Sequence, residues 1–184
     1  MDGNLRYVAN APQKRDYAAG RVANVKAQHP FAAVLSCSDS RVEPELVFDQ
    51  GLGDIFVVRV AGNIADDDGL ASLEYAVEHL GVPLVTVLGH SNCGAVQAAV
   101  SRLTEHAELP GHLSELIKFI EPAVIAAQAR HPSDLVAAAV EENVNLNVQR
   151  LKEDTPVLAD ALKSGKLGIR GGVYDLATGK VALL

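Results

Sequence analysis

Three short apolar runs, separated by polar loops and segments of good helix formers, constrain the fold of this 184-residue chain more than any other feature. The runs cover residues 31–36, 55–60 and 83–88, and each is short enough to be a buried parallel strand. Strands that alternate with helices in this way are typical of βαβ units. The sequence therefore predicts an α/β fold in which a mostly parallel central sheet is flanked by helices.

The other segments complete this prediction. Helices are expected over residues 12–28, 43–49, 70–80, 94–104, 111–128 and 132–152, and a last short helix is expected to begin at Thr155-Pro156. The helix over 111–128 is expected to break near Pro122. Residues 167–184 contain two turn-forming stretches and predict a hairpin at the edge of the sheet. Because 48% of the residues are apolar and no linker or repeat interrupts the chain, we expect residues 1–184 to form a single domain.

Charge and terminal sequence bear on partners and location. The net charge of −7 argues against a surface that binds nucleic acid or anionic lipid, which would need clustered Lys and Arg. Residues 1–6 lack the apolar stretch of a secretory signal, and no apolar run is long enough to span a bilayer. We therefore expect a cytoplasmic protein with no nucleic-acid or membrane partner.

Two cysteines and a histidine follow the ends of two predicted strands. Cys37 follows the first strand, and His90 and Cys93 follow the third. Ligands bind beyond the carboxyl ends of the strands in open α/β sheets, and a helix start at Cys93 favours a thiolate. Two thiolates and an imidazole suit Zn²⁺ and leave the open fourth position of a catalytic site. The same residues would also fit two buried cysteines or one disulfide beside an ordinary loop histidine, and spacing alone does not decide.

Asp39 and Arg41 belong to the loop that carries Cys37. An arginine can bind a carboxylate through two hydrogen bonds and keep it ionised. A carboxylate fixed beside a zinc-bound water can accept the hydrogen bond of that water and orient it toward a substrate. The alternative is an ordinary surface ion pair, which contributes little to stability.

These residues lie in segments that resemble a known family. The first signature of the β-class carbonic anhydrases is similar to Cys37-Ser38-Asp39-Ser40-Arg41-Val42. The second is similar to Glu74-Tyr75-Ala76-Val77 followed by Gly89-His90-Ser91-Asn92-Cys93-Gly94. The resemblance extends over residues 28–100 and, more weakly, over residues 141–144 and 172–175.

The resemblance implies the reversible hydration of carbon dioxide to bicarbonate and a proton. It implies one Zn²⁺ per subunit, bound by Cys37, His90 and Cys93. It also implies a dyad of Asp39 and Arg41 beside the metal, in which Asp39 can leave Arg41 and become a fourth zinc ligand in a closed state.

The resemblance further implies an active site at a subunit interface of a homodimer or homotetramer. Gln28, Phe56 and Tyr75 fall where the family lines its substrate pocket, partly from the neighbouring subunit. Gly94 falls where a backbone N–H can face the substrate. Simpler interpretations exist for each: core aromatic residues, a polar residue at a helix end, and a turn glycine.

Two other functions remain open at this point. A hydrolase for carbonyl sulfide or carbon disulfide could use the same zinc and dyad with a different pocket. A non-catalytic zinc or redox protein could use Cys37 and Cys93, and its zinc content and free thiols would distinguish it. A zinc deaminase is disfavoured because the chain has no Cys-x-x-Cys pair.

Overall fold

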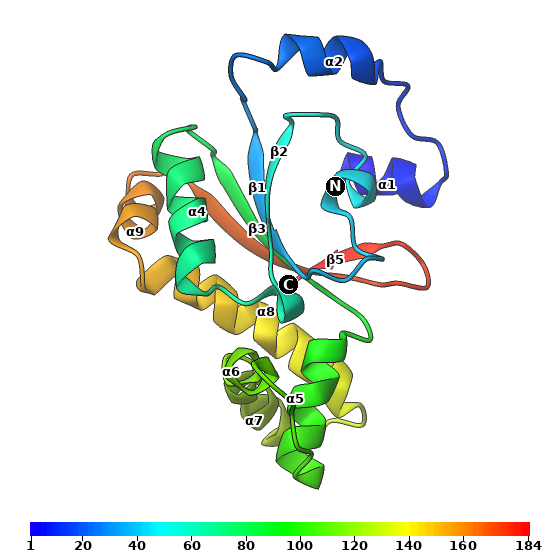
Figure 1. Cartoon of the computed structure of the whole chain (residues 1–184), viewed down its shortest axis with the longest axis vertical. Helices are drawn as coiled ribbons and strands as arrows, with labels where there is room; N and C mark the ends of the chain where they lie inside the picture. The colour runs from blue at the N-terminus through cyan, green and yellow to red at the C-terminus, as the bar shows by residue number, and fades with distance from the viewer.

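A five-stranded sheet in the order β2-β1-β3-β4-β5 forms the centre of the computed structural model, which describes residues 1–184 (Figure 1). The strands are β1 (Ala32–Ser36), β2 (Ile55–Arg59), β3 (Leu84–His90), β4 (Gly168–Tyr174) and β5 (Val181–Leu183). The first four are mutually parallel where they pair, and β5 runs antiparallel to β4 at one edge. The predicted α/β fold with a mostly parallel sheet is therefore confirmed, and so is the hairpin at its edge.

Helices pack on this sheet and extend beyond it. They are α1 (Asp2–Val8), α2 (Tyr17–Ala23), α3 (Pro44–Val47), the 3₁₀ turn η1 (Ala61–Asn63), α4 (Asp67–Glu78), α5 (Gly94–Glu105), α6 (Leu113–Ile117), α7 (Glu121–Gln128), α8 (Leu135–Glu153) and α9 (Pro156–Lys163). Helix α8 packs on β3 and β4, and α4 packs on β1 and β2. Helices α5 to α7 form a lobe beyond the carboxyl ends of the strands (Figure 1). None of the helices combines the length and apolar character needed to cross a bilayer.

Strand β1 is buried on both faces because its side chains alternate between two apolar clusters. Ala33 and Leu35 join the cluster under α4 and α8, whereas Val34 joins a second cluster on the opposite face. On the α8 side, glycines let the helix approach closely: a Cβ atom at Gly171 would lie 2.7 Å from the side chain of Val144. The site-bearing strands are thus fixed from both sides.

The N-terminal prediction is wrong. Within the range 12–28 predicted to be one helix, only α2 is helical, and α1 lies before this range. Asp16 caps α2 by accepting hydrogen bonds from two backbone N–H groups, so the helix begins after Asp16. Helix α1 is held by buried Asn4, whose amide donates to the carbonyls of Val47 and Gly179 at 3.1 and 2.8 Å. Those contacts are distant in sequence, so no local pattern could indicate them.

Other boundaries differ by a few residues. Helix α4 begins at Asp67, earlier than predicted, because Asp66 accepts the N–H of Gly69 as its cap. The break predicted near Pro122 in the segment 111–128 is confirmed, because α6 ends before it and Pro122 stands in the first turn of α7. His90 is the last residue of β3 rather than part of the following turn. The sheet itself therefore fixes the position of His90.

Candidate metal centre

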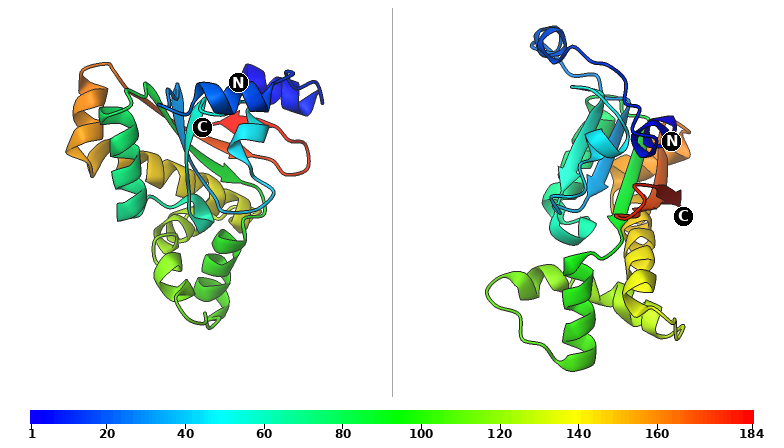
Figure 2. Two further views of the ribbon diagram at one scale, coloured as in Figure 1. Left: turned by 45° about the horizontal axis from the view of Figure 1, so that its top comes forward. Right: turned by 90° about the vertical axis from the view of Figure 1, so that its right-hand side faces the viewer.

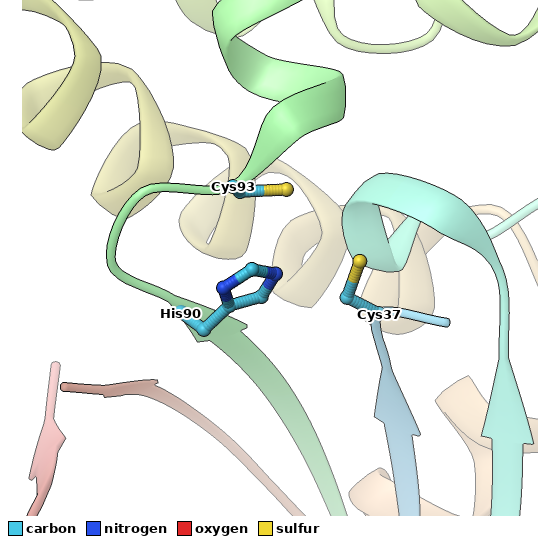
Figure 3. Close-up of side chains that lie close together, drawn as sticks. All are labelled: Cys37, His90 and Cys93. Atoms are coloured by element: carbon cyan, nitrogen blue, oxygen red, sulfur yellow. The ribbon is translucent and has the colours of Figure 1, made fainter. Parts of the chain in front are cut away.

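Cys37, His90 and Cys93 come together at the carboxyl edge of the sheet (Figure 3). Cys37 directly follows β1, His90 ends β3, and Cys93 is the residue before helix α5. Because β1 and β3 are parallel neighbours, both strands end at the same edge. The sulfur and ring-nitrogen atoms of the three residues all lie within 4.8 Å of one another, and all three residues are buried.

The three residues fit a metal ion. Both cysteines are free thiols, so the disulfide alternative does not describe this structure. The Nδ1 atom of His90 lies 2.9 Å from the carbonyl oxygen of Ser91, which selects the tautomer with its proton on Nδ1. The Nε2 atom is buried and has no hydrogen-bond partner. A buried ring nitrogen without a partner, beside two sulfur atoms, has the geometry of a metal ligand.

The two thiols differ in their protonation. The contact with Cys93 lowers the pKa of Cys37 to about 4, against the effect of burial, and His90 and the N–H of Gly62 add to the shift. The adjacent Cys37 thiolate and burial raise the pKa of Cys93. The contact between the two sulfur atoms therefore favours one thiolate and one thiol over two thiolates, and a bound cation would favour loss of the second proton.

Asp39 and Arg41 form a bidentate pair beside this group. The Nε and terminal nitrogen atoms of Arg41 donate to the two carboxylate oxygens of Asp39 at 2.9 and 2.7 Å. These bonds hold the pKa of Asp39 well below its usual range, although burial opposes the shift. The Oδ2 atom of Asp39 lies 3.9 Å from Nε2 of His90. In this structure the carboxylate is bound to Arg41 and lies next to the candidate ligands.

Arg59 is a site residue that the sequence analysis missed. It ends β2 in register with Ser36, and its guanidinium donates to the backbone carbonyls of Cys37 at 3.0 Å and Asp39 at 2.7 Å. A third bond, of 2.8 Å, joins it to the carboxylate of Glu43. Arg59 thus holds the loop that carries both a candidate ligand and the dyad. An arginine at a strand end facing a polar loop was the only sequence signal.

Of the residues expected to line the substrate pocket, only Gly94 lies beside the candidate metal ligands within one chain. Gly94 follows Cys93 directly and lies at the site as the first residue of α5. Phe56 pairs with Ala33 near the start of β2, three positions before Arg59, which places it about 10 Å along the strand from the site edge. Its ring lies 6.4 Å from the ring of Tyr75, between centroids.

Gln28 also lies away from the site. It is exposed and precedes β1, whereas Cys37 follows that strand. Within one chain the structure does not bring Gln28, Phe56 or Tyr75 to the candidate ligands.

Comparisons with known proteins agree with this site. The model of the carbonic anhydrase family matches residues 32–181. A carbonic anhydrase of Mycolicibacterium smegmatis is 41% identical over 99% of this chain and 88% of its own length.

Similar solved structures identify the class of carbonic anhydrase. The β-carbonic anhydrase CcaA superposes with a TM-score of 0.80 at 29% identity, covering 91% of this chain and 85% of that one. A structure from Sordaria macrospora, described as one of two tetrameric β-carbonic anhydrases, has a TM-score of 0.80 at 25% identity and covers 91% and 90%. The chain therefore belongs to the β-class carbonic anhydrases. Its activity is the reversible hydration of carbon dioxide, and no observation favours the sulfur analogues.

Replacing Arg59 by Met tests its hold on the loop. This change keeps most of the side-chain stem but leaves the carbonyls of Cys37 and Asp39 without their donor, so we expect a loss of about 1–3 kcal/mol in the free energy of unfolding. Urea denaturation measures it. Arg102→Met is the control, because Arg102 makes one partly exposed ion pair with Glu121 and should lose no more than about 1 kcal/mol. Equal losses in the two variants would contradict this role of Arg59.

Proposed function

We propose that this chain hydrates carbon dioxide with one zinc ion per subunit, held by the sulfur atoms of Cys37 and Cys93 and by Nε2 of His90. The supporting observation is the buried, unpartnered Nε2 atom beside two free thiols. A zinc ion bound there would act as a Lewis acid that makes water nucleophilic at neutral pH, with one coordination position left for that water.

Asp39 is proposed to orient the attacking water. Arg41 occupies both carboxylate oxygens with its own hydrogen bonds and keeps the group ionised. Oδ1 also accepts the backbone N–H of Arg41 at 3.0 Å, whereas Oδ2 accepts a single bond and has a further lone pair. Oδ2 can therefore still accept a hydrogen bond from a water near His90. The bidentate contact favours the open arrangement as the resting state. A closed state, with Asp39 as fourth zinc ligand, requires the two hydrogen bonds from the Arg41 guanidinium to break.

Gly94 is proposed to bind bicarbonate through its backbone N–H. It opens helix α5, whose first N–H groups have no acceptor within the helix. The space where a Cβ atom of Gly94 would lie has no atom within 4 Å, so a small anion can approach the backbone. The N-terminal end of a helix also favours negative charge.

A homodimer or homotetramer is proposed, in which Gln28, Phe56 and Tyr75 reach the site of a neighbouring subunit. Their distance from Cys37 in one chain supports this arrangement. Helix α2 has no buried residue and stands away from the body of the molecule (Figure 2). On or beside this helix, Tyr17, Val22 and Val25 are 59%, 71% and 76% accessible, and such a group of exposed apolar side chains is typical of a protein interface. The tetrameric Sordaria relative assembles beyond the single chain.

Domain organisation and location complete the proposal. Residues 1–184 are proposed to act as one domain, because the apolar cluster that contains Cys37 and Cys93 joins the sheet edge to helices α5, α7 and α8. The cytoplasm is the proposed location, since two cysteines that must remain reduced persist best in a reducing compartment.

Cys93→Ser tests the metal assignment. A neutral hydroxyl replaces a thiolate in a three-ligand site, so we expect the variant to lose most of its zinc and nearly all of its carbon dioxide hydration. Zinc content by elemental analysis and stopped-flow hydration measure the two effects. Ser72→Ala on helix α4 is the control and should retain both. Full zinc occupancy with unchanged activity in Cys93→Ser would show that the assignment is wrong.

Asp39→Asn tests the proposed orientation of water. The amide keeps the size of the side chain but loses the negative charge, so we expect turnover to fall by about 10²–10⁴-fold while zinc content stays unchanged. Asp160→Asn is the control, because Asp160 is exposed and its partner, Lys163, is also exposed. Wild-type turnover in Asp39→Asn, or a loss of zinc that accounts for the defect, would contradict the role.

A further inference from the structure

A buried chain of hydrogen bonds connects helix α8 to the turn η1. The Oδ1 atom of Asn147 accepts the backbone N–H of Ala65 at 2.7 Å. The Nδ2 atom of Asn147 lies 2.7 Å from the carbonyl oxygen of Asn143 and 3.2 Å from its Oδ1. Asn143, only 1% accessible, donates from Nδ2 to the carbonyl of Gly62 at 2.8 Å. Two amide side chains one helical turn apart therefore hold the backbone within η1, at Gly62, and two residues beyond it, at Ala65.

The direction of each bond in this chain is fixed by the backbone groups at its ends. The N–H of Ala65 can only donate, so the oxygen of the Asn147 amide must face it. The nitrogen of Asn147 then faces Asn143, and the nitrogen of Asn143 faces the carbonyl of Gly62, which can only accept. Both amide orientations follow from the network itself.

Gly62 carries this restraint to a candidate metal ligand. Its N–H donates to the sulfur of Cys37 at 3.2 Å, and this contact is buried. Gly62 has a φ of +76°, and a Cβ atom there would lie 2.5 Å from the side chain of Ile120. Only glycine fits at this position, in a left-handed conformation. The bond from Asn143 to the carbonyl of Gly62 therefore also fixes the direction of the Gly62 N–H.

We propose that Asn143 is a positioning residue for the metal centre, which acts through Gly62 to hold an N–H group against the sulfur of Cys37. The inference rests on the proposed zinc site and deepens it. Cys93 directly precedes the N-terminus of α5, and the backbone N–H groups of Ala95 and Val96 face its sulfur. Cys37 follows a strand and has no helix start of its own, so η1 and Asn143 supply the corresponding donor.

The N–H donor has two consequences for a bound metal. It fixes the direction from which the sulfur approaches, and it withdraws electron density from the thiolate. Partners that orient a ligand in this way change metal affinity by about 10–100-fold when they are removed. A charge-transfer transition from sulfur to metal should also move to lower energy when the thiolate loses its donor.

Asn143→Leu removes, at nearly constant volume, the amide that binds the carbonyl of Gly62. The N–H of Gly62 is then no longer held against the sulfur of Cys37. We expect zinc affinity, measured by competition with a chromophoric chelator, to weaken by about 10–100-fold. In the cobalt-substituted protein we expect the sulfur-to-cobalt charge-transfer band to shift to longer wavelength. A role confined to the packing of α8 would not move that band.

Leu151→Ala is the matched control. Leu151 is fully buried on the same helix, two turns from Asn143, so its truncation also destabilises the protein. We expect this variant to retain wild-type zinc affinity and an unshifted band. Asn147→Leu removes a hydrogen bond to the Asn143 amide but leaves the bond from Asn143 to Gly62 in place. We expect it to shift the band in the same direction by a smaller amount. If Asn143→Leu does not fold, Asn147→Leu is tested in its place.

The outcomes separate this inference from the function on which it rests. A wild-type protein that binds no zinc would overturn the proposed function. A wild-type protein that binds zinc, together with an Asn143→Leu or Asn147→Leu variant whose affinity and band match those of Leu151→Ala, would overturn the role of Asn143 alone.

Discussion

The parallel pairing of β1 with β3 is the interaction on which the site depends. Their register, with Ser36 beside Leu88, ends both strands at one edge and sets Cys37 next to His90. Helix α5 must then begin at this edge, which brings in Cys93. Three ligands from two segments more than fifty residues apart thus meet because two strands share a direction and a register.

Buried contacts from other elements restrain this group. Arg59 on β2 binds the loop of Cys37 and Asp39 from one side, and Asn143 on α8 binds η1 from the other. The side chains of Arg59 and Asn143 donate these hydrogen bonds to backbone carbonyls, so they fix the position of the loop and of η1 and do not take part in the reaction. Ser91 adds a third restraint, because its carbonyl orients the ring of His90 while its hydroxyl accepts the N–H of Leu176 in the β4–β5 hairpin. Such outer contacts control the affinity and reactivity of metal ligands.

Much of this could be predicted from the sequence because it depends on local pattern and on one rule of topology. Apolar runs gave the strands, and their parallel arrangement predicted that Cys37 and His90 meet at one edge. The helix predicted over 12–28 was wrong because Asp16 caps a shorter helix that begins after it, although the residues before Asp16 are themselves helix formers. Arg59 and Asn143 could not be predicted, since their roles depend on strand register and on contacts across the core. The separation of Phe56 from Cys37 likewise appears only once the register is known.

The central claim is that two sulfur atoms and one nitrogen atom of this chain bind a single zinc ion. X-ray absorption at the zinc edge of the zinc-loaded protein tests it most directly. The account predicts a first shell with two sulfur atoms at about 2.3 Å and one imidazole nitrogen at about 2.0–2.1 Å, completed by one light atom. A shell with no sulfur, or with only one, would contradict it.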